Sequence, residues 1–225
     1  MSMRKGRNVK LREFSLWAYK LELNDSRAFT LENRCVCAHF ERHFKSLEVD
    51  NIYRVVIKLG EPDQRDGTTE ESSSVLKFYS NFDFDHFYKL TGIERKEFLL
   101  STLYTALLKV CELKVWDIEP FKQAYRRVIE DKFDNSYEVS TKNNRARSMA
   151  ASLNAQHTEE QFNLVIIVKN NDGKVIFERQ VLSEEPDEFL FNGQIGNLKW
   201  TSNDILTYIA KDKSVIETMN LSPNG

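Results

Sequence analysis

The sequence contains little glycine and proline, with eight and four residues among 225. Phosphate-binding loops and flexible linkers depend on glycine, so both are scarce in this chain. The patterns G-x-x-x-x-G-K-[ST], G-x-G-x-x-G, G-x-S-x-G, H-E-x-x-H and C-x-x-C do not occur. The sequence therefore lacks the common signatures of nucleotide-binding proteins, serine hydrolases, zinc proteases and thiol oxidoreductases.

Long apolar runs are also missing, because no segment reaches the roughly 18 residues of a membrane span. The nearest, 98–113, is interrupted by five polar residues. The basic N-terminus is not followed by the apolar region of a signal peptide. Three cysteines do not indicate a disulfide framework. We therefore expect a cytoplasmic protein with reduced thiols and no membrane partner.

The overall charge has no strong sign, since 32 basic and 34 acidic residues give a formal net charge of -2. No global field attracts nucleic acid or an anionic membrane. One local exception is the predicted flexible tail 1–12, where basic residues occur without acids. These are Arg4, Lys5, Arg7, Lys10 and Arg12. The arm is the one segment where we expect nucleic acid to bind, and a solvated tail is the favoured interpretation.

A helical hairpin is predicted at about 92–133. Its first helix is apolar around most of its circumference, except for a polar seam of Thr102, Thr105, Lys109 and Glu112. Thr91 and Glu94 fit a capping box at its start. Asp117 fits the N-cap of the second helix, which has Pro120 in its first turn.

The segment before the hairpin is predicted to be mixed. Strands are expected at 13–23, 51–59 and 75–80, with a long exposed loop over 60–74. Apolar residues at helical spacing favour a helix over 29–47, although part of this segment also fits a strand. A short helix is expected after Asp83, whose side chain can cap it.

After Asn135 the apolar period changes to two, which indicates an antiparallel meander. Strands are expected at 136–141, 147–155, 161–169, 174–182, 197–201, 205–210 and 214–219. The turn 170–173 ends in Asp-Gly, a strong hairpin signal. The fold class is therefore α+β: a central helical hairpin (about 92–133) flanked by an N-terminal α/β segment and a C-terminal antiparallel β-meander. We prefer one domain over 13–220, and the alternative is two subdomains, 13–135 and 136–220.

Cys35, Cys37, His39 and His43 form the densest group of metal-ligand residue types. Neighbouring ligands on one helix face or one strand face lie roughly 6 Å apart along the element, so one ion can reach only adjacent pairs. A complete zinc site would need further ligands. We therefore favour buried cysteines beside partly exposed histidines, and we expect no cofactor.

Two other groups invite a chemical interpretation. Asp83, Asp85 and His86 resemble a cation-binding arrangement of phosphoesterases, but capping and the helix dipole explain the two acids. Six aromatic residues lie between 78 and 88, namely Phe78, Tyr79, Phe82, Phe84, Phe87 and Tyr88. Stacking platforms for single-stranded nucleic acid combine aromatics with basic residues. Here the charges balance, so a core corner is favoured.

We therefore interpret the protein as a non-catalytic cytoplasmic protein-binding module. Two acid-rich loops can attract a basic partner. Their acids are Glu61, Asp63, Asp66, Glu70, Glu71, Glu184, Glu185, Asp187 and Glu188. An immunity-type inhibitor of a basic toxin is one concrete version, by analogy of charge alone. The alternative is a metal-dependent hydrolase or a nucleic-acid-associated enzyme of unrecognised type.

Charge reversal tests the acidic-loop hypothesis. Replacing the acids of 61–71 or of 184–188 by lysine should abolish capture of a co-purifying partner, because the steering charge is inverted. The melting temperature should not fall. Retention of the partner by both sets of variants would reject the hypothesis.

Overall fold

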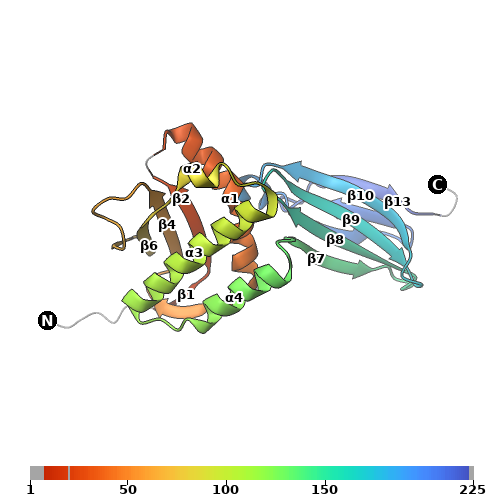
Figure 1. The fold of residues 1–225 in the computed structure, drawn as a ribbon. Coiled ribbons are helices and arrows are strands. Elements are labelled where there is room, and N and C mark those ends of the chain that lie inside the picture. Colours follow the sequence, from red (N-terminus) through yellow and green to blue (C-terminus); the bar gives the residue numbers. More distant parts are fainter. Residues whose placement is uncertain (1–7, 20, 223–225) are drawn as a thin grey trace. The chain divides into compact units, whose positions relative to one another are not determined.

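The structure is a computed structural model that describes residues 8–19 and 21–222. The chain divides into two compact units, Met1–Asp134 and Asn135–Gly225. Figure 1 labels most of the elements of each unit. An α+β fold with a C-terminal antiparallel meander is confirmed.

The first unit contains a four-stranded sheet in the order β2-β4-β6-β5. Its strands are β2 (Glu13–Ala18), β4 (Arg54–Gly60), β5 (Thr69–Ser72) and β6 (Val75–Asn81). β2, β4 and β6 are parallel, and β5 pairs antiparallel with β6. One face supplies alternate apolar residues to the core, all of them nearly inaccessible. They are Phe14, Leu16, Ala18, Val55, Ile57, Leu59, Leu76 and Phe78.

Helix α1 (Leu23–His43) packs against β2 and bonds to four backbone polar groups of its free edge. In an outer strand, alternate N–H and C=O groups point away from the sheet. Here the Phe14 N–H donates to Glu41 Oε1 at 2.6 Å, and the Phe14 carbonyl accepts from Arg34 Nη1 at 2.9 Å. Asn33 donates to the Leu16 carbonyl and Ser26 to the Ala18 carbonyl.

The favoured helix over 29–47 is confirmed for 29–43, and the expected strand 13–23 is wrong after Ala18. The residues at 26, 33, 34 and 41 follow helical spacing, so they present one polar stripe to β2. Phe29, Val36 and Phe40 of the same helix are buried in the core. α1 is therefore polar toward the strand edge and apolar toward the sheet face.

Three short strands were missed by the sequence patterns. β1 (Asn8–Leu11) pairs antiparallel with β3 (Leu47–Asp50), and β5 lies inside the predicted loop 60–74. The expectation of a flexible tail over 1–12 therefore does not hold for residues 8–11. Arg4, Lys5 and Arg7 of the basic arm lie outside the described residues. Four-residue strands are too short to show a clear period of two.

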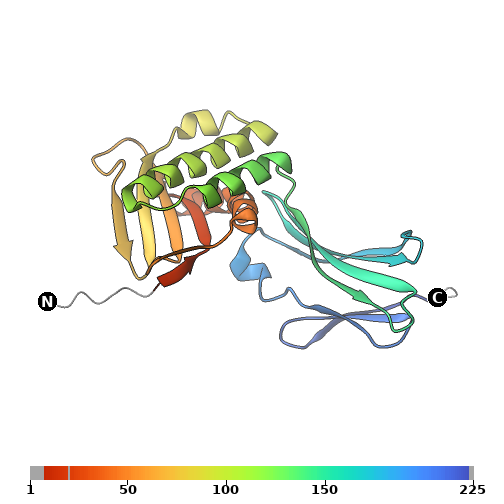
Figure 2. The ribbon, with the colours of Figure 1, turned by 90° about the horizontal axis from the view of Figure 1, so that it is seen from below.

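The helical hairpin is present as α3 (Gly92–Lys114) and α4 (Glu119–Glu130), which lie side by side in Figures 1 and 2. Both contribute buried residues to the core of the first unit. Thr91 is the N-cap of α3, but its side chain makes no capping bond, so the predicted capping box is wrong. Asp117 accepts from the Glu119 N–H at 3.0 Å just before α4. The short helix α2 (Phe84–Phe87) is capped by Asp83 as expected.

The second unit contains two antiparallel sheets, β10-β9-β8-β7 and β11-β12-β13. The first sheet consists of β7 (Ser136–Asn143), β8 (Met149–His157), β9 (Phe162–Asn170) and β10 (Val175–Glu184). The second consists of β11 (Asn197–Trp200), β12 (Ile205–Ile209) and β13 (Val215–Asn220), and the short helix α5 (Glu188–Phe191) precedes it. Every predicted strand of the meander is confirmed, as is the turn at 170–173. Residues of both sheets share one apolar core.

The fully buried Tyr208 ties the second sheet to the segment after α5. Its hydroxyl donates to the Gln194 carbonyl at 2.9 Å and accepts from the Gly196 N–H at 3.1 Å. A Cβ at Gly196 would lie 1.9 Å from the Ile209 carbonyl oxygen, so only glycine fits there. Burial raises the pKa of the Tyr208 phenol, which keeps this donor protonated.

The bonds from α1 to the edge of β2 generate a stability prediction. Arg34→Ala removes the donor to the Phe14 carbonyl and the ion-pair partner of Glu41, whose side chain is only 17% exposed. Leaving half-buried polar groups unpaired should lower the free energy of unfolding by about 2 kcal/mol. Urea denaturation of the full chain measures this loss.

Arg127→Ala is the matched control. Arg127 pairs with Glu130 on the exposed surface of α4, with side chains 65% and 58% exposed. This change should alter the free energy of unfolding by less than about 0.5 kcal/mol. Equal losses in the two variants would show that Arg34 does not stabilise the strand edge.

Candidate functional site

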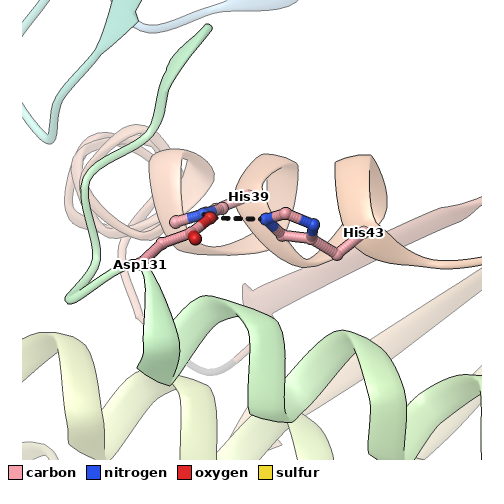
Figure 3. A group of neighbouring side chains, drawn as sticks. All are labelled: His39, His43 and Asp131. Atoms are coloured by element: carbon pink, nitrogen blue, oxygen red, sulfur yellow. Dashed lines mark hydrogen bonds and ion pairs between the residues drawn. The ribbon is translucent and has the colours of Figure 1, made fainter.

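His39 and His43, two members of the predicted metal-ligand group, meet Asp131 instead of the cysteines (Figure 3). Cys35 and Cys37 are buried; the Cys35 thiol donates to the Glu32 carbonyl and the Cys37 thiol to Asn33 Oδ1. In the part of the chain that the structure describes, the group of possible metal ligands within 4.8 Å of one another is His39, His43 and Asp131. The predicted metal-ligand set is therefore corrected: Cys35 and Cys37 do not belong to the group, and Asp131 does.

The positions of the two histidines follow from the helix. Residues four apart on α1 lie on the same face, and this face packs against α4. Asp131 immediately follows α4. Its Oδ2 lies 3.0 Å from His39 Nε2 and 2.7 Å from His43 Nε2, so one carboxylate oxygen serves both imidazoles.

The three side chains differ in exposure and in charge preference. The His39 side chain is 1% exposed, His43 20% and Asp131 35%. Burial lowers the pKa of His39 to about 4, against the opposing effect of its hydrogen bond to Asp131. The hydrogen bond from His39 is the main cause that lowers the pKa of Asp131. At neutral pH His39 is therefore a neutral imidazole beside a charged carboxylate.

No sequence pattern indicated Asp131. It lies 88 residues after His43 and belonged to the exposed side of the predicted second helix. Only the packing of α1 on α4 brings it to the histidines. A residue whose role depends on a helix–helix contact leaves no local signal.

A second feature is the turn between α3 and α4. Val115 has a φ of 55°, in the left-handed region, and is 91% exposed. The Trp116 N–H donates to the Cys111 carbonyl and the Val115 N–H to that of Glu112, which makes a Schellman motif. Glycine usually occupies this left-handed position, and a β-branched residue there is strained.

Other exposed apolar residues surround Val115. Leu113 is 54% and Ile118 37% exposed. Exposed acids flank them, namely Glu112, Asp117 and Glu119. The turn thus exposes apolar side chains beside acidic ones, and we call Leu113, Val115 and Ile118 the apolar turn.

The acids of the first predicted loop are mostly bonded within the unit. Asp63 accepts from the Tyr19 hydroxyl and pairs with Arg65. Glu70 pairs with Lys77, and Glu71 pairs with Lys114 at the end of α3. Asp66 is half-buried, and Glu61 lines a pocket. These contacts reduce the charge that the loop presents to a partner.

The acids of the second predicted loop lie at the end of β10 and in α5. Glu184 accepts from Gln194 Nε2 at 3.0 Å. Glu185 is exposed, whereas Asp187 and Glu188 are half-buried at the start of α5. The proposal that this loop binds a partner stays a prediction.

The polar seam of α3 faces a pocket and not the core. Thr102, Thr105 and Lys109 line a volume of about 830 Å³ at the ends of β4 and β6, together with Asp83 and Asp85. Asp83 Oδ1 accepts from the His86 N–H at 2.8 Å, and the His86 ring contacts Phe98. Asp83, Asp85 and His86 do not converge as metal ligands among the described residues.

The aromatic segment 78–88 forms a core corner, as favoured. Phe78, Phe82 and Phe87 are buried, and Phe82 packs edge-on against Phe84 with ring centroids 4.7 Å apart. Tyr88 is half exposed.

Comparison with known proteins gives no relative: no family model, no curated protein and no solved structure matches the chain. Among residues 8–19 and 21–222, no helix combines the length and the apolar composition needed to cross a bilayer. The candidate sites therefore rest on their own geometry.

The lowered pKa of His39 predicts acid destabilisation. In the unfolded state the imidazole of His39 binds a proton near pH 6.5, whereas in the folded state it binds one only near pH 4. As the pH falls through this window the unfolded state gains protons, so stability is present above it and is lost within it. Chemical denaturation at pH 7 and pH 5 should show a loss of about 1–2 kcal/mol that His39→Gln removes.

His86→Gln is the control for this measurement. His86 lies in α2, where its ring contacts Phe98, and its replacement should leave the loss assigned to His39 in place. An unaltered pH dependence in His39→Gln would contradict the assignment to His39. The lowered pKa of Asp131 adds a further loss only below its ordinary value of 3.8.

Proposed function

We propose that the protein is a non-catalytic protein-binding module that binds its partner through the apolar turn. The observation that carries this proposal is Val115, which is 91% exposed and strained at once. A left-handed conformation costs a β-branched residue roughly 1–2 kcal/mol. Glycine would avoid that cost, and a polar residue would avoid exposing an apolar side chain.

The surroundings of Val115 match the composition of an interface. Protein–protein interfaces have an apolar centre and a polar border. Leu113 and Ile118 extend the apolar centre. Val115 and Ile118 line a shallow pocket of about 600 Å³ together with the half-buried side chains of Leu108 and Trp116. The apolar turn is therefore a small apolar surface to which a partner can bind.

The charges around the apolar turn define the partner. Glu112 makes no ion pair with a described residue, and Asp117 and Glu119 are also exposed. Glu71 pairs with Lys114, the basic residue between Leu113 and Val115, so this pair adds no net charge to the border. The partner would present an apolar cavity with lysine or arginine at its edge, which is the complementarity that favours fast and specific association.

This proposal keeps the basic partner of the acidic-loop hypothesis and moves the centre of contact to the helical turn. An inhibitor of a basic toxin remains one version of it. The cytoplasm is the proposed compartment, and the three buried cysteines, which form no disulfide, agree with reducing conditions.

Val115→Gly tests the proposal because it separates binding from folding. Glycine fits the left-handed conformation, so the free energy of unfolding should not fall and should rise by up to about 1 kcal/mol. The loss of the anchor should weaken partner binding at least tenfold. The tagged full chain is purified from its native host, the retained partner is identified, and its affinity for both variants is measured.

Val215→Gly is the matched control. Val215 lies in β13 of the second unit and is 61% exposed. Its replacement should leave binding unchanged. Wild-type affinity in Val115→Gly would reject the apolar turn as the interface, whatever the partner is.

A further inference from the structure

We propose that His39, His43 and Asp131 bind a divalent cation of the zinc class. The three side chains come from two helices and converge on one point, since both Nε2 atoms face the same Oδ2. Two imidazoles and one carboxylate are a donor set that zinc and neighbouring transition metals accept.

The spacing of the ligand atoms fits a single ion. Ligand atoms about 2.0–2.1 Å from one zinc ion lie roughly 3.3 Å apart in a tetrahedron. The nitrogen–oxygen distances of 3.0 and 2.7 Å are a few tenths shorter. A small outward movement of the side chains therefore admits the ion, and each neutral imidazole then carries its proton on Nδ1.

The backbone provides a second reason for a cation here. α1 ends at His43 and α4 ends at Glu130, directly before Asp131. A helix carries partial negative charge at its C-terminus. Two such ends meet at the cluster, and both favour a positive ion.

The chain directly after Asp131 adopts an uncommon backbone conformation. Lys132 and Phe133 have φ values of 52° and 61°, both in the left-handed region. Phe133 is buried, and its N–H donates to the Val128 carbonyl at 3.2 Å. Consecutive left-handed residues other than glycine are costly and tend to occur where a site needs them.

Basic residues nearby limit the affinity. Arg42, Lys45, Arg126 and Arg127 line a pocket of about 530 Å³ together with His43. They repel a cation, while Glu130 in the same pocket attracts it. We therefore expect micromolar binding. The ion would keep an open coordination position, because only three protein ligands are present.

The experiment uses the full chain, stripped with a chelator and dialysed. Calorimetric titration with Zn²⁺ should show one ion per chain, and Co²⁺ should give the visible absorption of a nitrogen- and oxygen-ligated ion. His43→Gln and Asp131→Asn should each weaken Zn²⁺ binding roughly tenfold or more. Circular dichroism of the metal-free variants checks that both are folded.

His86→Gln and Cys35→Ser are the controls, and both should bind Zn²⁺ like the wild type. Cys35 belongs to the set suggested by the sequence but is not a member of the group formed by His39, His43 and Asp131. Absence of stoichiometric Zn²⁺ binding to the wild type would overturn the proposal. Wild-type affinity in His43→Gln or Asp131→Asn, or lost binding in Cys35→Ser, would overturn the assignment of these ligands.

Discussion

The hydrogen bonds between α1 and the free edge of β2 are the interaction on which the first unit depends. An outer strand exposes unpaired backbone groups, and water normally satisfies them. Here four side chains of one helix do so, from Ser26 at one end of the strand to Glu41 at the other. These directional bonds set both the rotation and the axial position of the helix.

The rotation of α1 determines what its other faces do. With the stripe of Ser26, Asn33, Arg34 and Glu41 against the strand edge, Phe29, Val36 and Phe40 enter the core. His39 and His43 then face α4 and reach Asp131. One rotation of about 100°, a single residue step, would separate the histidines from the carboxylate. The polar stripe therefore positions the candidate metal site without touching it.

The extent to which the fold could be predicted follows from the length of each pattern. α3 and the longer strands of the second unit have clear periods, and these elements were predicted correctly, as was the four-residue β11. β1, β3 and β5 are four residues long and were missed; β1 and β3 pair with each other although β2 and α1 lie between them in the chain, whereas β5 pairs with β6 through a tight turn. The capping box at Thr91 was a matching pattern whose side-chain bond does not form.

The candidate sites were likewise predicted only in part. His39 and His43 were recognised because they are close in sequence, while Asp131 joins them only through helix packing. The strain at Val115 could not be predicted, because no residue of the sequence Leu-Lys-Val-Trp-Asp indicates a left-handed conformation. The ion pair of Glu70 with Lys77 was not predicted either, because it depends on the register of β5 and β6.

The covered edge of β2 also constrains how the protein associates with other chains. The outward carbonyls of Phe14, Leu16 and Ala18 and the outward N–H of Phe14 are already bonded to α1, which hinders the pairing of β2 with a strand of another molecule. The opposite edge, β5, is only four residues long and carries Glu70 and Glu71, which oppose edge-to-edge pairing. The four-stranded sheet of the first unit is thereby poorly suited to extension at either edge.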